Sequence, residues 1–568
     1  METIKLFLQK RKLEVAVIVA VVLIEIFALS LSWGQLLKAR QWMIPFGLGG
    51  FFAVAAILFE KSILRKKVEG FLNRPVGWRL TSLLCILGVS VGILFYGMRQ
   101  FGSIDHAILI DSAWRLYQGQ VPYQSFCCKL PPGFLIGGVL AFNLFGLRWF
   151  SLLLVNALFA IATFCWSAWL LRKFTKDGLV SLFLASLLQV ASTVLLSHWW
   201  YNTAAVIAGI LFPLSAIYFL SEKRSIAASL SYFGSLLLLV LMKPNIAGIE
   251  VVGITSIVFF ASSARKRFQV IFLSGLAGIS FIAILSLFNI NLNYLLASYS
   301  SISQRAFTFS QFLEKNWHDA PIIERGLFVV SWIVLGLLLL EMCIRIMPYI
   351  NARIGIAFIV LLAGIIFIIN GTENELVSVQ LLVFGVWIVA RECLTLGKCI
   401  NSYRVLIFLC CFLLGASIGE TLVRYRVLQA GFCLFFQEET SRERLSGDFF
   451  QRFCGSPIFT ELHRELANTI PLFTETRRSV WFGPRLVWAY ADFGLPSPIN
   501  QPLIWEKGVL YASQEEDALI QDWEQKKFDV LIFFRDDTVY LPKKLLAFIK
   551  ENYFLFQRKN FITVYYRK

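Results

Sequence analysis

Apolar runs close to the length of a membrane-spanning helix recur along most of this 568-residue chain. A helix needs about 20 residues to cross the roughly 30 Å hydrocarbon core of a bilayer. Only helices and closed barrels satisfy their backbone inside lipid, and these runs lack the alternation of barrel strands. Because 57% of the residues are hydrophobic and only 16% are charged, the composition excludes an ordinary soluble domain. The sequence therefore predicts a helical protein that crosses the membrane many times.

About thirteen spans are expected at the lengths that a bilayer requires. They are 14–32, 44–60, 80–98, 149–171, 179–196, 204–220, 226–242, 246–263, 269–287, 326–344, 354–370, 376–390 and 405–418. The first span follows basic residues but is long for a signal peptide, so we interpret it as a retained helix. Glu25 lies in its middle, where a carboxylate is costly, and indicates either a proton path or a bond to a neighbouring helix.

The net charge of +17 is concentrated between the spans, because basic and acidic residues nearly cancel beyond residue 419. Lys and Arg gather in alternate connections: the N-terminal tail, 61–79, 172–178, 221–225, 264–268, 345–353 and 391–404. Since cytoplasmic loops are rich in Lys and Arg, these connections are predicted to face inward and the C-terminus outward. Nucleic-acid binding would need the charge on one folded face, so no such partner is expected.

Two predicted outer connections, 99–148 and 288–325, are too long to be turns, and long loops in compact folds are usually functional. Each contains a helix-like amphipathic stretch, 113–117 and 310–314, that is expected to lie along the membrane surface. The apolar stretch 133–146 is too short to span the bilayer, so it is predicted to be re-entrant or interfacial.

The membrane domain is thus expected over 1–418, followed by a small extracytoplasmic α/β domain over 419–568. Periodicity predicts strands at 479–482, 529–534 and 561–566, and helices at 514–527 and 542–553. No catalytic or phosphate-binding motif appears in this part, so we interpret it as a structural or acceptor-docking domain.

The first outer connection carries an ordered set of residues. The set is Asp105 and His106, Ala113, Leu116, Gly119, Pro122 and Tyr123, Phe126, Lys129, Pro131 and Pro132, and Phe145 and Gly146. It resembles the first outer loop of the GT-C superfamily of membrane glycosyltransferases, especially the protein-O-mannosyltransferase and aminoarabinose-transferase branch. The pattern of that branch has an acidic pair, an alanine, a glycine, a tyrosine, a Lys-Pro-Pro-like element and a closing Phe-Gly.

The resemblance implies that Asp105 is the general base and that Lys129 contacts the donor phosphate. A carboxylate can take the proton of an acceptor hydroxyl, and a cation stabilises the charge that grows on the departing phosphate. Further candidate substrate-binding residues are Arg115, Tyr123, Arg148, His106 and Lys243. His106 departs from the family's second acidic residue, which weakens the case for a two-carboxylate or metal site.

Each candidate has a simpler interpretation. Asp105 follows a predicted span and could be a solvated residue at a helix end. Lys129 and Arg148 could extend toward lipid headgroups. Asp111 is expected on a solvated face, and the two prolines, Pro131 and Pro132, are ordinary in a loop.

All four histidines, His106, His198, His318 and His463, fall on the predicted outer side. They lack a metal-binding spacing, so no metal ligand is assigned, although a divalent ion stays open. We hypothesise that His198 and His318 line the same cavity as Asp105. Among the outward cysteines, Cys433 and Cys454 are the plausible disulfide pair, while sequence alone does not fix connectivity.

The sequence thus predicts a cell-membrane glycosyltransferase that moves a sugar from a polyprenyl-phosphate donor to a lipid, glycan or protein acceptor at the outer face. The alternative is a transporter or flippase of lipid-linked glycans, although the chain shows no convincing internal repeat of the kind transporters often have. A non-catalytic envelope scaffold would leave the pattern from Asp105 to Gly146 unexplained.

Overall fold

A computed structural model of the chain provides the structure. It describes residues 63–99, 101, 104–189, 199–222, 224–300, 351–369, 375–395, 443–445, 447–507, 510–535, 537–538 and 540–568. The expected spans 14–32, 44–60, 326–344 and 405–418 lie outside these residues, as do Glu25, His198, His318 and Cys433.

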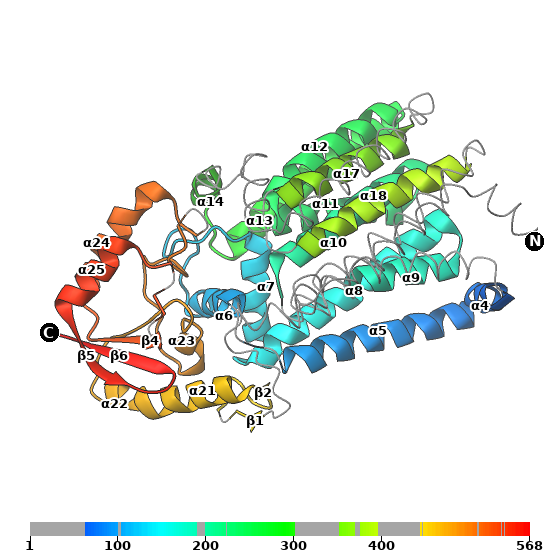
Figure 1. Ribbon diagram of the computed structural model, residues 1–568. Helices are drawn as coiled ribbons and strands as arrows, with labels where there is room; N and C mark the ends of the chain where they lie inside the picture. The colour runs from blue at the N-terminus through cyan, green and yellow to red at the C-terminus, as the bar shows by residue number, and fades with distance from the viewer. Residues whose placement is uncertain are drawn as a thin grey trace, which may run out of the picture.

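A bundle of long helices forms the larger part of the described structure (Figure 1). Its members are α4 (Ile63–Leu72), α5 (Pro75–Gly97), α8 (Trp149–Thr175), α9 (Gly178–Gln189), α10 (Tyr201–Ser221), α11 (Ile226–Met242), α12 (Pro244–Ala261), α13 (Ala264–Leu287), α17 (Ala352–Ile369) and α18 (Glu375–Thr395). Within the described ranges, four helices are long and apolar enough to cross a membrane, namely α5, α8, α10 and α13. Five shorter apolar segments accompany them, four of which lie in α11, α12, α17 and α18.

Helix α10 lies at the centre of the bundle and is buried along nearly its whole length. It packs against α8, α11, α12, α17 and α18, which explains why its sequence is apolar on every face. At the periphery, α5 and α13 expose large apolar side chains such as Leu84, Val91 and Ile279. These outward faces suit contact with lipid rather than with water.

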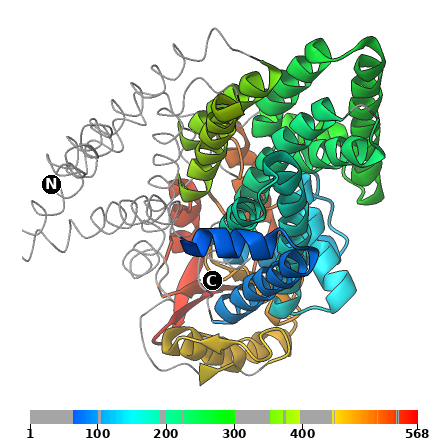
Figure 2. The same cartoon turned by 90° about the vertical axis from the view of Figure 1, so that its right-hand side faces the viewer.

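Among the basic connections, 172–178 and 264–268 and the described residues of 61–79 and 221–225 lie at one end of the bundle, which Figure 2 shows from the side where α4 lies. There Lys266 donates to the carbonyls of Phe219 and Leu220 at the end of α10. Arg353 of α17 pairs with Glu392 of α18 at 3.0 Å. Cations at helix C-termini interact favourably with the helix dipole, so the positive charge at this end also stabilises the bundle.

Three shorter helices lie at the opposite end: α6 (Ile104–Tyr117), α7 (Pro132–Phe145) and α14 (Leu292–Ser300). Helix α7 starts with Pro132 at its first position, where proline lacks no needed donor. It ends at Gly146, whose φ of 86° favours glycine. Helix α7 is the apolar stretch that is too short to span, and most of its side chains are buried.

The C-terminal part contains a four-stranded sheet in the order β3-β4-β6-β5. The strands are β3 (Val480–Phe482), β4 (Val530–Phe534), β5 (Tyr553–Arg558) and β6 (Ile562–Arg567); β3 is parallel to β4, and the other pairs are antiparallel. The remaining elements are β1 (Glu443–Arg444), β2 (Cys454–Gly455), α21 (Pro457–Thr469), α22 (Pro471–Thr474), α23 (Ala489–Asp492), η5 (Ser513–Glu515), α24 (Glu516–Lys526) and α25 (Lys543–Asn552). Strand β5 and helix α21 were not predicted from the sequence.

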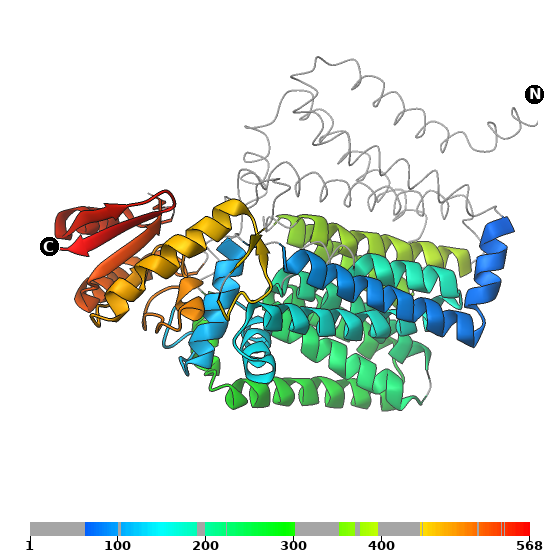
Figure 3. The same ribbon diagram turned by 90° about the horizontal axis from the view of Figure 1, so that it is seen from below.

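The C-terminal part is docked on α6, at the end of the bundle away from the basic connections (Figure 3). One continuous core of buried side chains runs from α6 and α7 into α21, α23 and the sheet. At its centre, the ring of Phe101 lies 5.0 Å from Phe450, 4.8 Å from Phe459 and 5.6 Å from Trp488. The surface on which the outer helices would otherwise meet water is therefore covered by this domain.

Candidate active site

Asp105 lies in the first turn of α6 and is half-buried. A carboxylate in this position interacts favourably with the positive end of the helix dipole. The expectation that Asp105 ends a span changes in detail, because α5 ends at Gly97 and Asp105 belongs to a separate helix. Helix α6 therefore fixes Asp105 at the boundary between the bundle and the C-terminal domain.

His106 is buried in the aromatic core beside Asp105, with 4% of its surface exposed. Its ring lies 5.3 Å from Phe101 and 5.4 Å from Trp149, the first residue of α8. Trp149 is itself fixed by a hydrogen bond from its indole nitrogen to the carbonyl of Gly97. His106, which replaces the family's second carboxylate, thus packs against Phe101 and the start of α8, and this burial does not suit the predicted contact with substrate.

Asp111 and Arg115 form a buried ion pair on α6, with 2.8 Å between Arg115 Nε and Asp111 Oδ2. The expectation of a solvated Asp111 is wrong, because its side chain is fully buried and accepts a hydrogen bond from Ser497 Oγ at 2.6 Å. Burial raises the pKa of this carboxyl, while Arg115 and Ser497 oppose the rise. The sequence pattern of α6 does not show that the C-terminal domain covers Asp111, and for this reason the prediction of a solvated side chain failed.

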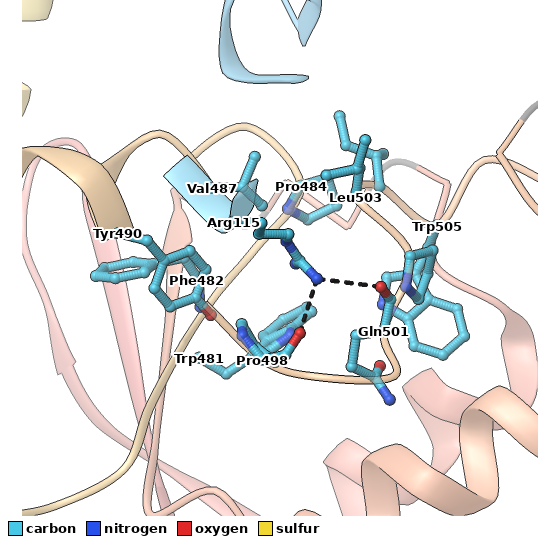
Figure 4. A pocket seen from close by; sticks show the side chains of 12 residues that line it. Arg115, Trp481, Phe482, Pro484, Val487, Tyr490, Pro498, Gln501, Leu503 and Trp505 are labelled. Atoms are coloured by element: carbon cyan, nitrogen blue, oxygen red, sulfur yellow. Dashed lines mark hydrogen bonds between the residues drawn. The ribbon is translucent and has the colours of Figure 1, made fainter. Parts of the chain in front are cut away.

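Arg115 enters a small pocket of the C-terminal domain, as Figure 4 shows. Its Nη1 donates to the backbone carbonyls of Pro498 at 2.7 Å and Gln501 at 3.2 Å. Aromatic and proline side chains surround the guanidinium, and only 1% of the residue is exposed. Arg115, which was predicted to bind substrate, therefore holds helix α6 and the C-terminal domain together.

Lys129 precedes α7, and its ammonium nitrogen is buried without a hydrogen-bond partner in the described part of the chain. The residue is 8% exposed, and burial lowers the pKa of its amine, against which Glu515 and Cys127 act. Buried polar groups almost always have partners, so an orphan ammonium needs an explanation. An anion that binds there would supply the missing acceptor.

Tyr123 connects the first outer segment with the second. Its hydroxyl donates to the carbonyl of Leu130 and interacts with Tyr299 of α14. Ser298 of α14 donates to the carbonyl of Cys128 at 2.8 Å. These contacts hold the loop that carries Lys129 against α14, and the predicted contact of Tyr123 with substrate stays a prediction.

Lys243 lies between α11 and α12 and is buried. Its Nζ donates to Asn202 Oδ1 at 2.7 Å, and it lies 5.5 Å from the ring centre of Tyr201. Arg148 caps the start of α8 and is exposed, so its predicted contact with substrate stays a prediction. Neither Asp105 nor Lys243 forms a hydrogen bond or ion pair with Lys129.

No group of three or more His, Cys, Asp or Glu side chains that could hold a metal occurs in the ranges that the structure describes. His463 pairs with Asp492 at 2.9 Å inside the C-terminal core. Burial raises the pKa of the Cys127 and Cys128 thiols to about 12, so both stay protonated. The hypotheses on His198, His318 and the Cys433–Cys454 disulfide stay predictions.

Comparisons with known proteins give similarities of fold alone. No protein-family profile matches the chain, and no curated protein matches its sequence. The apo structure of ArnT from Cupriavidus metallidurans has a TM-score of 0.43 at 14% identity, over 86% of this chain and 98% of ArnT. The structure of the same protein bound to undecaprenyl phosphate has a TM-score of 0.36 at 13% identity, over 87% and 98%.

A further similar structure is the Archaeoglobus fulgidus oligosaccharyltransferase in complex with Zn and sulfate, at TM-score 0.36 and 10% identity, over 85% of this chain and 72% of that one. Both proteins are GT-C glycosyltransferases, the superfamily that the first outer segment resembles. Because every TM-score is below 0.5, these similarities add no detail to the site.

Proposed function

We propose that this protein transfers a sugar from a polyprenyl-phosphate donor to an acceptor hydroxyl at the outer face of the cell membrane. The observation that carries the proposal is the buried ammonium of Lys129, which has no described partner. An uncompensated cation in a protein interior costs stability, and a phosphate is the anion that best offsets this cost. The N-terminus would then be cytoplasmic and the C-terminal domain extracytoplasmic.

Asp105 is the proposed general base. A half-buried carboxylate at the edge of the bundle can take the proton of a lipid, glycan or protein hydroxyl. The acceptor oxygen then forms a bond to the anomeric carbon, the bond to the phosphate oxygen breaks, and the phosphate leaves with the electron pair. Lys129 would stabilise the negative charge that grows on this phosphate.

Lys243 is the proposed second cation for the donor. Its Nζ is held by Asn202 Oδ1 at 2.7 Å, between the start of α10 and the start of α12, so the charged end of this side chain has a defined position. Arg115 is left out of this role because its guanidinium binds the C-terminal domain. The lipid tail of the donor would lie along the apolar helices.

The decisive experiment compares Asp105→Asn with the wild type in membranes supplied with polyprenyl-phosphate sugars. General bases contribute roughly 10²–10⁴-fold to rate, so transfer should fall by that order while donor binding persists. Asp517→Asn, on the exposed surface of α24, is the matched control. Full transfer by Asp105→Asn would falsify the assignment of the base.

The same membranes also distinguish a transporter from a transferase. We expect Asp105→Asn to translocate the donor as the wild type does. If the wild type transfers no sugar and Asp105→Asn loses donor translocation, the result would favour a flippase. A parallel assay with a chelator tests the open question of a divalent ion.

A further inference from the structure

One hydrogen bond and one close approach link α10 with the start and the middle of α12. At the outer end, Lys243 donates to Asn202. Two turns deeper on the same two helices, Glu250 of α12 lies against Gly209 of α10. A β-carbon built on Gly209 would lie 3.1 Å and 3.4 Å from the two carboxyl oxygens. Gly209 follows Asn202 by seven residues, and Glu250 follows Lys243 by seven residues. Because α10 and α12 run in the same direction, each pair is separated by the same rise of about 10 Å along its helix.

Glu250 is completely buried, and neither of its carboxyl oxygens has a hydrogen-bond partner in the described ranges. In the described ranges no Lys or Arg side chain donates a hydrogen bond to either oxygen, so no such bond balances a negative charge there. An isolated carboxylate inside an apolar bundle is so unfavourable that the group takes up a proton instead. Glu250 is then a neutral acid with one O–H donor.

The backbone carbonyl of Gly209 is an acceptor for that donor, because a proline leaves it without its usual hydrogen bond. Pro213 lies inside α10, four residues after Gly209. Proline has no N–H, so the carbonyl of Gly209 loses its usual intrahelical hydrogen bond, and the proline ring pushes that carbonyl outward. Gly209 lacks a side chain, which lets the Glu250 carboxyl come this close.

We propose that Glu250 is protonated and donates a hydrogen bond to the carbonyl of Gly209 that Pro213 leaves open. This bond joins α10 to α12 two turns below Asn202 and Lys243. It makes Glu250 a positioning residue, because a shift of α12 relative to α10 moves the Lys243 ammonium away from Asn202. The positioning role rests on the proposed function, whereas the hydrogen bond does not.

The protonation state is tested by infrared spectroscopy of the purified chain in lipid nanodiscs. Glu250→Gln should remove a carbonyl stretch of a protonated carboxylic acid and leave the carboxylate bands unchanged. Pro213→Ala restores an N–H to α10, competes for the Gly209 carbonyl, and should shift the Glu250 band toward that of a weaker hydrogen bond. Loss of a carboxylate band in Glu250→Gln would overturn the proposal, as would an unshifted acid band in Pro213→Ala.

A double-mutant cycle on the thermal midpoint supplies a second, independent readout. Glu250→Leu should lower the midpoint in the wild-type background and lower it less in Pro213→Ala, because the Gly209 carbonyl is then satisfied within α10. Additive effects would contradict the bond. Thr255→Val is the matched control, since it removes the 3.1 Å hydroxyl contact of α12 with Tyr232 and should be additive with Pro213→Ala.

The positioning role is tested by the affinity for polyprenyl phosphate. Glu250→Leu should raise the Kd several-fold and Glu250→Gln, whose amide can still donate, should restore it. Equal affinities in all variants, with the infrared result intact, would refute positioning and retain the hydrogen bond. If the wild type binds no polyprenyl phosphate, the proposed function fails while the spectroscopic test of Glu250 still decides the bond.

Discussion

The Lys129 side chain places a charge where folding alone would not favour one. Its ammonium is buried without a hydrogen-bond partner in the described ranges, and the Glu515 carboxylate opposes only part of the desolvation, so the buried charge destabilises the protein. Removing this group should therefore stabilise the fold and weaken donor binding. A residue whose loss helps folding and harms binding is best explained by a ligand.

We predict that Lys129→Met raises the unfolding free energy by about 1–3 kcal/mol, the usual cost of an unpaired buried polar group. The same variant should bind polyprenyl phosphate about 10–100-fold more weakly, since a hydrogen bond to a charged group contributes roughly 1.5–3 kcal/mol. Denaturation in detergent and titration with polyprenyl phosphate measure the two effects. Lys550→Met, on the exposed surface of α25, should change neither; a destabilised Lys129→Met with normal affinity would show that Lys129 is structural.

The pH dependence follows from the lowered pKa of Lys129. Burial depresses this pKa below 10.5, so the amine loses its charge at a lower pH than an exposed lysine. Between the depressed pKa and 10.5 the unfolded chain binds more protons, so the unfolding free energy of the ligand-free protein rises with pH in that window. Binding of polyprenyl phosphate should weaken over the same window.

Lys129→Arg is the informative variant for this pH dependence, because a guanidinium stays charged throughout. Its affinity for polyprenyl phosphate should be independent of pH where that of the wild type declines. A decline of equal size in Lys129→Arg would assign the titration to another group.

At the residue scale, the sequence located Asp105 and Lys129 in one outer segment through the family resemblance. It did not reveal that Asp111 is buried, because its partner Ser497 lies more than 300 positions later in the chain. Local spacing along α6 shows which residues share a face. It does not show what lies against that face.

At the scale of elements, α6 is the piece that joins the membrane bundle to the C-terminal domain. Besides the Arg115 contacts, the Trp114 indole donates to the carbonyl of Leu495 at 2.8 Å and the Gln120 amide to that of Ser497 at 2.8 Å. Asp105 therefore lies at one end of α6, and the hydrogen bonds to the C-terminal domain lie at or just beyond its other end. A change that weakens these contacts between α6 and the C-terminal domain should therefore also shift the position of Asp105.

We predict that Arg115→Met destabilises this junction by about 3–5 kcal/mol, because it leaves Asp111 as a buried charge without its partner. Asp111→Asn combined with Arg115→Met should recover part of the loss, since no unpaired charge then remains. Limited proteolysis and denaturation of the single and double variants measure the effect. If Arg115→Met is as stable as the wild type, the ion pair does not hold the domain.

The secondary structure of the C-terminal part was predictable to different degrees. Strand β4 is buried at every position, and its continuous apolar run predicts a strand directly. Strand β5 was missed because its Phe554, Leu555 and Phe556 are exposed and follow α25 without a turn signal. Its pairing with β6 is set by the register of the sheet, which the local sequence does not specify.

At the scale of the whole molecule, the distribution of basic residues and the position of the C-terminal domain both distinguish the two ends of the helix bundle. The described connections that are rich in Lys and Arg lie at one end of the bundle, and the C-terminal domain lies at the other. The alternation of basic connections was readable from the sequence because it depends only on the order of the spans. The docking of the domain on α6 was not, since it depends on shape and on long-range hydrogen bonds.

This division predicts opposite exposure of two surface positions in intact cells. Arg265→Cys lies in the first turn of α13 at the basic end, and Lys550→Cys lies in the last turn of α25 in the C-terminal domain; both positions are exposed. A membrane-impermeant maleimide should label Lys550→Cys and not Arg265→Cys, because only the C-terminal domain faces outward if basic loops are cytoplasmic. Permeabilised cells, in which both variants should react, control for accessibility, and the unsubstituted chain controls for its native thiols. Labelling of Arg265→Cys alone in intact cells would reverse the orientation and place Asp105 and Lys129 on the cytoplasmic side, where the transfer proposed for the outer face could not occur.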